Sequence, residues 1–349
     1  MRRPLAAALG LAAALALAPA ALAAPAADSD GSGPATLAVI GDIPYGTSLI
    51  NEFPSDISEI NADPDVSRVI HLGDIKNGST RCDTSYFRQI RGDFDGFADP
   101  LVYTPGDNEW TDCHRASNGG YIPAGPTPAG QEPSRLDTIR ALFFDRPGFT
   151  LGQRRAPVWS QGPSTPENVI WKQADTIFAT LNVPGSNNDF LPWFDAAETD
   201  AQKAAQADEV AGRTAADVDW IDQAFDTARR EHAAAVAIGI QADMWDPAIV
   251  AAGPGQYSAF TPIVQELARQ AARFGKPVLL LNGDSHLYES DRPLTDPHAT
   301  TSLMYGVVQP VPNLVRVTVQ GSTNVPHEWL QLHVDPRSAD VFSWENVVF

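Results

Sequence analysis

Short runs of β-branched and leucine residues recur along the chain, and each is bounded by turn residues. Continuous apolar runs of this length are typical of strands that are buried on both faces. The clearest of these predicted strands are 37–40, 69–72, 101–103, 235–240 and 278–281. A hairpin is predicted at 168–171 and 176–183, and the tail alternates further strand-like runs at 314–319, 329–334 and 340–344.

Segments with helical spacing of apolar residues lie between these runs. The clearest helix is predicted to begin with Thr214 as its N-cap and to carry Val218, Ile221 and Phe225 on one face. A second starts at Thr261 and stops at Gly275. Weaker patterns cover 48–61, interrupted or delayed by Pro54, and also 84–97 and 135–144. This alternation of helices and strands predicts mixed sheets stacked between helices.

Four of the apolar runs lead into a Gly-Asp dipeptide, which places an aspartate just beyond a buried strand. These residues are Asp42, Asp74, Asp107 and Asp284. A single Gly-Asp is usually only a turn, but four copies behind strands predict one crevice at the carboxyl ends of a sheet. Carboxylates held close together repel one another unless a cation neutralises them. The pattern therefore predicts a metal ion in that crevice.

The first residues read as a processing segment. Arg2 and Arg3 precede an apolar run at 5–17, and a small-x-small cleavage pattern ends at Ala23. We expect a signal peptide at 1–23, a flexible lead-in at 24–34, and a single folded domain at 35–349. A retained membrane anchor is the alternative reading of the apolar run. The mature protein is predicted to be secreted or extracytoplasmic.

The chain is strongly acidic, with a formal net charge of -19. Nucleic acids and anionic membranes are therefore excluded as expected partners, because both require a basic surface. We expect no membrane contact after the leader is removed. A cationic cofactor suits the charge, and the oligomeric state is left open.

Cys82 and Cys113 are the only two cysteines of the chain. In an oxidising compartment a disulfide is the expected state, and two buried free thiols are the alternative. Each cysteine follows one of the Gly-Asp motifs, so a bridge would tie together the loops that carry Asp74 and Asp107.

The order of the motifs resembles that of the calcineurin-like metallophosphoesterases, which include the purple acid phosphatases. The resemblance is carried by Gly41-Asp42, Gly73-Asp74, Gly106-Asp107-Asn108-Glu109 and Gly283-Asp284-Ser285-His286. It spans nearly the whole mature chain. It implies a four-layer α/β/β/α sandwich of two mixed β-sheets flanked by helices, with two metals at the strand ends.

Several motif histidines and one asparagine are replaced in this chain, by Pro44, Asp107, Asn108, Gln241 and Asp284. Carried over by position, the resemblance implies one metal on Asp42, Asp74 and His286. It implies a second metal on Asp74, Asp107, Gln241 and Asp284, with Asp74 as the bridge. One or two divalent ions are expected, and the oxygen-rich donors favour Mn²⁺, Mg²⁺ or Ca²⁺ over Zn²⁺ or iron.

Asn108 stands where the family has the histidine that contacts the scissile phosphate. An amide cannot donate a proton and recover it near neutral pH, so the sequence lacks an obvious general acid. Lys76, Glu109 and His114 are the substitutes within reach of the loops. Each of the three also reads as a surface or salt-bridging residue.

The leading hypothesis is an exported metal-dependent phosphoesterase that uses a metal-activated water on a small-molecule phosphate ester. A catalytically degraded member that binds a metal or ligand without turnover is the alternative. A GDSL-type serine esterase is a third reading, suggested by Gly283-Asp284-Ser285, although Asp296-Pro297-His298 has the wrong spacing for its partner motif. The 184–188 segment reads as a polar turn, with lining of the crevice as the alternative.

Overall fold

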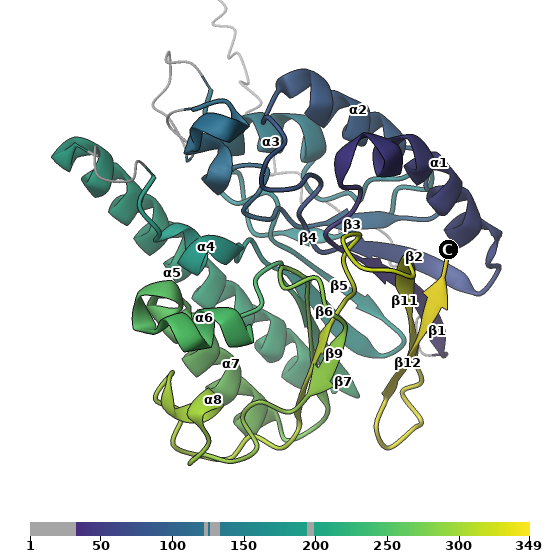
Figure 1. The fold of residues 1–349 in the computed structure, drawn as a ribbon. Helices are drawn as coiled ribbons and strands as arrows, with labels where there is room; N and C mark the ends of the chain where they lie inside the picture. Colours follow the sequence, from purple (N-terminus) through teal and green to yellow (C-terminus); the bar gives the residue numbers. More distant parts are fainter. Residues whose placement is uncertain (1–32, 122–124, 126–132, 194–198) are drawn as a thin grey trace, which may run out of the picture.

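Two β-sheets lie face to face in the computed structural model, which describes residues 33–121, 125, 133–193 and 199–349 (Figure 1). The first sheet has the order β12-β11-β1-β2-β3. Its strands are β1 (Ala35–Ile40), β2 (Val66–His71), β3 (Leu101–Tyr103), β11 (Glu328–Val334) and β12 (Phe342–Val348). The second sheet has the order β4-β5-β6-β7-β8-β10-β9. Its strands are β4 (Trp159–Ser160), β5 (Val169–Gln173), β6 (Thr176–Thr180), β7 (Ala235–Gly239), β8 (Val278–Asn282), β9 (Glu289–Asp291) and β10 (Leu314–Thr318).

Both sheets are mixed. In the first sheet β1, β2 and β3 run parallel, while β11 and β12 pair antiparallel. In the second sheet β6, β7, β8 and β10 run parallel, and β4, β5 and β9 form antiparallel edges. The parallel strands of each sheet therefore end along one edge, and the loops that leave them carry the predicted aspartates.

Helices cover the outer faces of both sheets (Figure 1). The longer ones are α1 (Gly46–Ala62), α2 (Thr84–Phe94), α3 (Arg135–Phe143), α5 (Asp200–Arg230) and α7 (Thr261–Phe274). The short ones are α4 (Gly185–Asp189), α6 (Pro247–Ala252) and α8 (Thr300–Leu303), with 3-10 turns η1 (Thr111–His114), η2 (Ala116–Asn118), η3 (Pro254–Gln256) and η4 (Ser258–Phe260).

Three hydrophobic cores among the described residues lie between the layers and hold them together. One core joins α1, α2 and α3 to the outer face of the first sheet through residues such as Phe53 and Phe94. A second core lies between the sheets and includes Val39 and Phe178. The third joins α5 and α7 to the outer face of the second sheet, as at Phe225. This stacking confirms the predicted four-layer α/β/β/α sandwich.

Two details of the predicted helices are wrong. The helix expected to begin at Thr214 starts at Asp200, with Thr199 as its N-cap in a capping box with Gln202. Its first turns are rich in alanine and polar helix formers, which give no apolar stripe for a sequence pattern to detect. In α1 the helix continues through Pro54, which lies on the exposed side.

The predicted leader at 1–23 and most of the lead-in at 24–34 lie outside the described residues. Among the residues that the structure describes, no helix is both long enough and apolar enough to cross a membrane.

Candidate metal centre

The predicted aspartates gather at the edge where the parallel strands end. Asp42 follows β1, Asp74 follows β2, and Asp284 and His286 follow β8. All four have left-handed backbone, with φ of 55°, 56°, 74° and 63° in that order. This conformation is uncommon for residues other than glycine, and where it occurs it clusters at functional sites.

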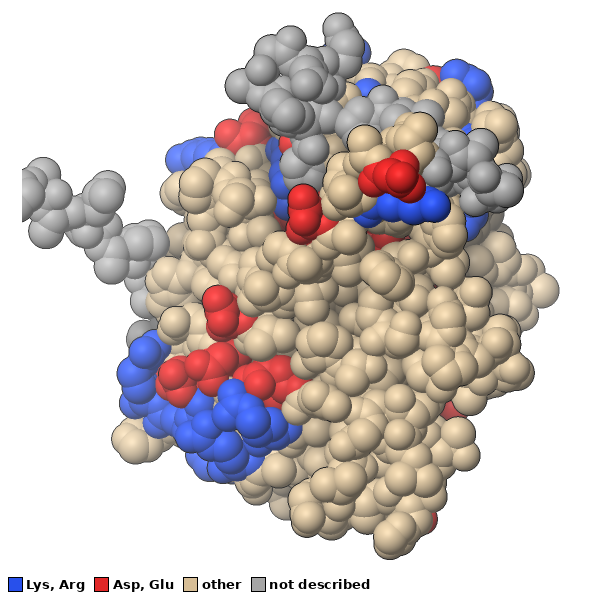
Figure 2. All heavy atoms as spheres, turned by 90° about the vertical axis from the view of Figure 1, so that its left-hand side faces the viewer, with Lys and Arg blue, Asp and Glu red and all other residues tan. Residues whose placement is uncertain are grey.

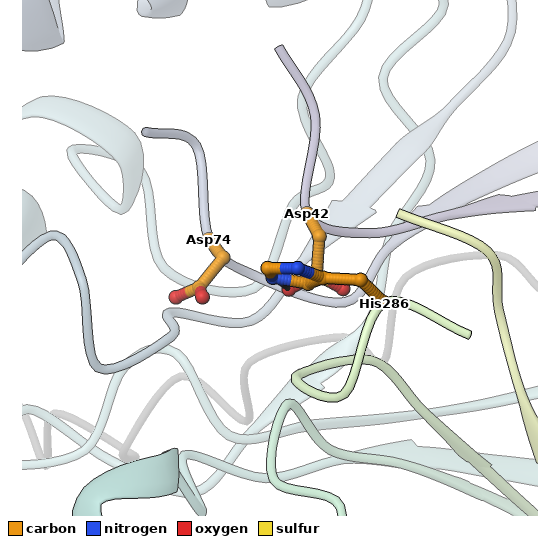
Figure 3. Close-up of side chains that lie close together, drawn as sticks. All are labelled: Asp42, Asp74 and His286. Carbon is orange, nitrogen blue, oxygen red and sulfur yellow. Dashed lines mark ion pairs between the residues drawn. The ribbon is translucent and has the colours of Figure 1, made fainter. Parts of the chain in front are cut away.

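One group of donors consists of Asp42, Asp74 and His286, which point toward one another in Figure 3. One ligand atom of each lies within 4.8 Å of the others. His286 Nε2 is 3.3 Å from Asp42 Oδ1. The two aspartates are buried, whereas the His286 side chain is 27% exposed. The group is therefore reachable from the side of the histidine.

A second group consists of Asp74, Asp107 and Asp284, again with donor atoms within 4.8 Å of one another. Asp74 belongs to both groups. Gln241 lies against the second group, but its Oε1 accepts a hydrogen bond of 2.5 Å from the Gly185 N–H, and its Nε2 is 3.4 Å from Asp107 Oδ1. The amide would have to turn before its oxygen became a ligand, so that role stays a proposal.

The negative charge of the two donor groups is only partly balanced by positively charged side chains. Burial and the neighbouring carboxylates raise the pKa of Asp74 and of Asp284 well above the usual range. Burial also lowers the pKa of Lys76, although Glu109 and Asp74 oppose this. For His286 burial lowers the pKa, but the hydrogen bond and charge of Asp42 outweigh it, and the pKa is raised. The excess of oxygen donors over cations fits a site for hard divalent ions.

Tyr45 contacts all three donors of the first group, and the sequence reasoning missed it. Its hydroxyl oxygen lies 3.0 Å from Asp74 Oδ2, 3.3 Å from Asp42 Oδ1 and 3.4 Å from His286 Nε2. Burial and the charges of Asp74 and Asp42 raise the pKa of Tyr45 well above its usual range, so the neutral phenol is positioned as a hydrogen-bond partner of the three donors. The sequence signal that could have identified Tyr45 is its position three residues after Asp42.

Asn108 and Glu109 hold the loops of the centre in place. Asn108 Nδ2 donates to Asp74 Oδ2 at 2.6 Å, and its backbone N–H donates to Asp74 Oδ1 at 3.1 Å. Glu109 Oε1 accepts from the backbone N–H groups of Asp74 and Gly106 and from the Tyr103 hydroxyl. Glu109 is fully buried, and these contacts favour a positioning role over contact with a substrate.

The other predicted substitutes for a general acid are Lys76 and His114. Lys76 is fully buried and its Nζ donates to the Asn77 carbonyl at 3.0 Å. His114 ends η1, where its Nδ1 is 2.6 Å from the Thr111 carbonyl oxygen. Of the two, Lys76 is the one whose charge acts directly on the carboxylates.

The predicted disulfide between Cys82 and Cys113 is confirmed. Both sulfur atoms lie against the carbonyl oxygen of Asn108, at 3.5 Å and 3.8 Å. The bridge therefore sits directly behind the loop that orients Asp74, and it joins the two loops that carry Asp74 and Asp107.

The 184–188 segment lines the second group, which was the alternative reading of the sequence. Ser186 Oγ lies 2.8 Å from Asp107 Oδ2 and 2.9 Å from Asp112 Oδ1. Its neighbour Gly185 lies so close that an added Cβ would meet Asp107 Oδ2 and both Asp284 oxygens at 2.8 Å. Ser186 to Asp189 all have left-handed φ, which turns this loop toward the centre.

The third sequence hypothesis, a serine esterase, finds no support in the contacts of Ser285. Its hydroxyl donates to Asp243 Oδ2 at 2.8 Å, and the same carboxylate pairs with the buried guanidinium of Arg316 at 2.5 Å. His298, from the motif with the wrong spacing, is exposed. Asp243 was missed from the sequence, and its backbone N–H donates to Asp284 Oδ2 at 3.2 Å.

The strand order, the stacked mixed sheets and the carboxylate-histidine groups give the metallophosphoesterase-like arrangement that the motif resemblance predicts. Two solved structures similar to this chain are GAP50, "the anchor in the inner membrane complex of Plasmodium", and the purple acid phosphatase PPD1 from yellow lupin (Lupinus luteus) seeds. GAP50 is 8% identical with a TM-score of 0.44, over 91% of this chain and 89% of that one. PPD1 is 10% identical with a TM-score of 0.46, over 91% of this chain and 54% of that one. No family model and no curated protein matches the sequence.

Proposed function

We propose that this chain is an exported, metal-dependent phosphoesterase that hydrolyses small-molecule phosphate esters. The observation that carries the proposal is the sharing of Asp74 between two adjacent donor groups at the ends of parallel strands. A shared carboxylate between two cation sites is the arrangement that places two ions on either side of a transferring phosphoryl group. Export is supported by the leader pattern and by the disulfide.

Each residue of the centre has a proposed task. Asp42, Asp74 and His286 would hold one ion, with the Tyr45 hydroxyl beside it. Asp74, Asp107 and Asp284 would hold the second, with Gln241 at its edge. When bound, divalent ions would supply the positive charge that stabilises phosphoryl oxygens and would acidify the attacking water. Mn²⁺, Mg²⁺ or Ca²⁺ suits these oxygen donors.

The remaining predicted catalytic residues are proposed to act through the centre. Asn108 orients Asp74 through two hydrogen bonds. Glu109 holds the loop by accepting a hydrogen bond from the Asp74 N–H, and the positive charge of Lys76 acts on the carboxylates. His114 holds the turn of η1. Because an amide at Asn108 cannot protonate a leaving group, esters with weakly basic leaving groups, such as aryl phosphates, are the suitable first substrates.

The experiment measures metal stoichiometry and turnover in the same preparations. Chelator-treated protein is titrated with Mn²⁺ by calorimetry and then assayed with an aryl phosphate. We expect two ions for the unaltered protein, one for Asp42→Ala and for Asp284→Ala, and loss of both sites with Asp74→Ala. The exposed Asp296→Ala is the matched control and should bind both ions.

Two outcomes would contradict the proposal in different ways. Metal uptake without any turnover that depends on Asp74 would support the alternative, a degraded member that only binds a metal or ligand. Unchanged stoichiometry in all three variants would show that the aspartates do not bind metal at all.

A further inference from the structure

A run of apolar residues lies on the surface beside the metal centre. We call residues 247–255, which form α6 and the turn after it, the apolar rim. The rim contains no charged side chain and no polar one, and α6 has no buried residue. Ile249 packs in part against the core under α5 and α7, while the half-buried Val250 and the exposed prolines and alanines leave apolar surface open beside the centre.

Both ends of the apolar rim are hydrogen-bonded to loops that contact the second donor group. At its start, the Asp246 side chain caps α6 through the Ala248 N–H, and the Asp246 N–H donates to the Asp243 carbonyl. The Asp243 N–H in turn donates to Asp284 Oδ2.

At the other end of the rim, the Gly255 carbonyl accepts a hydrogen bond of 2.9 Å from Asn187 Nδ2. The residue before Asn187 is Ser186, whose hydroxyl contacts Asp107. Figure 1 shows α6 next to α4, which carries these two residues. The rim therefore runs alongside the centre, from the Asp284 side to the Asp107 side.

The rim itself lacks charge although the chain as a whole carries -19, and Asp246 at its start is the nearest charged residue along the chain. No charged residue occurs from 247 to 265. Figure 2 shows this face of the molecule, and among the described residues its charged side chains gather at the top and lower left, leaving a broad uncharged area between them. Leu287, which follows His286 directly, is 63% exposed. Such a border suits a neutral organic group rather than an ionic one.

We propose that the apolar rim binds the organic group of the substrate, so that the substrates are phosphate esters of apolar alkyl or aryl alcohols. This inference rests on the proposed phosphoesterase function. The phosphate would lie at the aspartate centre while the carbon chain or ring covers Val250 and the exposed part of Ile249, which are both half-buried. Removing these side chains and the ester's organic group from water together supplies the binding energy.

The test uses alkylphosphonates, which carry a phosphate-like head and cannot be hydrolysed as esters. Calorimetry measures the Kd of methyl-, propyl- and hexylphosphonate for the full chain in the presence of Mn²⁺. We expect the Kd to fall by about two- to fourfold for each added methylene, as expected for partial to full burial of the group. Val250→Asn should remove most of this dependence on chain length. Val348→Asn, at a valine on β12 that is 57% exposed, is the matched control and should keep it.

Each outcome has one reading. Binding of methylphosphonate that requires Mn²⁺, with a Kd that does not change with chain length, would overturn the rim proposal and leave the phosphoesterase intact. No Mn²⁺-dependent binding of any phosphonate would instead count against the centre itself. A change of oligomeric state on Val250→Asn in sedimentation, or metal-independent binding of neutral phosphatidylcholine vesicles through the rim, would assign the rim to a second copy or to a membrane and reject the proposal.

Discussion

The hydroxyl oxygen of Tyr45 lies 3.0 Å from Oδ2 of Asp74, the carboxylate that both donor groups share. The same oxygen is within 3.4 Å of the other two donors of the first group. We expect Tyr45→Phe to weaken Mn²⁺ binding at the first site by roughly tenfold, which is typical when the hydrogen-bond partner of a ligand is lost. The second site shares only Asp74 with the first and should lose less affinity.

Calorimetric titration of Tyr45→Phe with Mn²⁺ measures this difference between the two sites. Tyr305→Phe is the control, because it also removes a buried hydroxyl, one that donates to the Met244 carbonyl away from the donor groups. Equal affinities in both variants would show that the phenol is a bystander.

Gly185 leaves no room for a side chain beside the second donor group. An added Cβ would lie 2.8 Å from Asp107 Oδ2 and from both oxygens of Asp284, so these ligands would have to move. We expect Gly185→Ala to lower the Mn²⁺ affinity of the second site by tenfold or more, on the order of the loss seen when ligand support is removed. Gly212→Ala, where nothing lies within 4 Å, should bind as the unaltered protein does. Normal binding by Gly185→Ala would mean that the loop is free to retreat.

The disulfide is expected to contribute to both stability and metal binding. Replacing Cys82 and Cys113 together by serine should lower the free energy of unfolding by about 2–4 kcal/mol. It should also weaken Mn²⁺ binding, because the bridge lies against the Asn108 carbonyl behind Asp74. Urea unfolding and calorimetry measure the two effects. Reductant should reproduce both effects in the unaltered protein and have no effect on the serine variant. Unchanged Mn²⁺ affinity in the serine variant would show that the disulfide does not support the metal centre.

Asp217 provides a pH dependence that is separate from the metal centre. Burial raises the pKa of this carboxyl to about 8 from its ordinary 3.8, although Arg213 and Asn168 oppose the rise. Between pH 3.8 and about 8 the folded protein therefore keeps a proton that the unfolded chain has already released. The contribution of Asp217 to the free energy of unfolding therefore falls as the pH rises through this window, by at most about 1.4 kcal/mol per pH unit.

Asp217→Asn should remove that part of the slope, because its amide stays neutral. Urea unfolding at several pH values, in chelator, measures the effect. Asp219→Asn is the matched control, since Asp219 is exposed on the same helix. If the slopes of Asp217→Asn and the unaltered protein were the same, Asp217 would be ionised in the folded state.

The sequence was sufficient to predict the strands, apart from the short edge strands β4 and β9, and the convergence of the aspartates. Buried strands leave continuous apolar runs, and the parallel order brings their ends to one edge whatever the loops do. The structure brings Asp42, Asp74, Asp107, Asp284 and His286 together in two groups, while the oxygen of Gln241, the remaining residue of the implied sets, is hydrogen-bonded to Gly185. Whether the two groups bind metal is the question for the titrations above.

The parts that escaped prediction depend on local geometry that residue types do not determine. The Tyr45 hydroxyl contacts Asp42, Asp74 and His286, but a tyrosine at that position of the sequence could equally pack in a core. The turn at Ser186 was ambiguous because Ser, Asn and Asp suit both ordinary turns and left-handed backbone. The oxygen of Gln241 is bound by Gly185, a contact between residues 56 positions apart.

The left-handed backbone at Asp284 restricts how this site is able to diverge. Few side chains other than Gly, Asn, Asp and His tolerate that conformation at modest cost. At the position of Asp284 the metallophosphoesterase motif has a histidine. Both residue types belong to that small set. Substitutions tolerated at this position therefore tend to exchange one metal-binding side chain for another. We expect such substitutions to change which metal ion is preferred more readily than whether a metal ion binds.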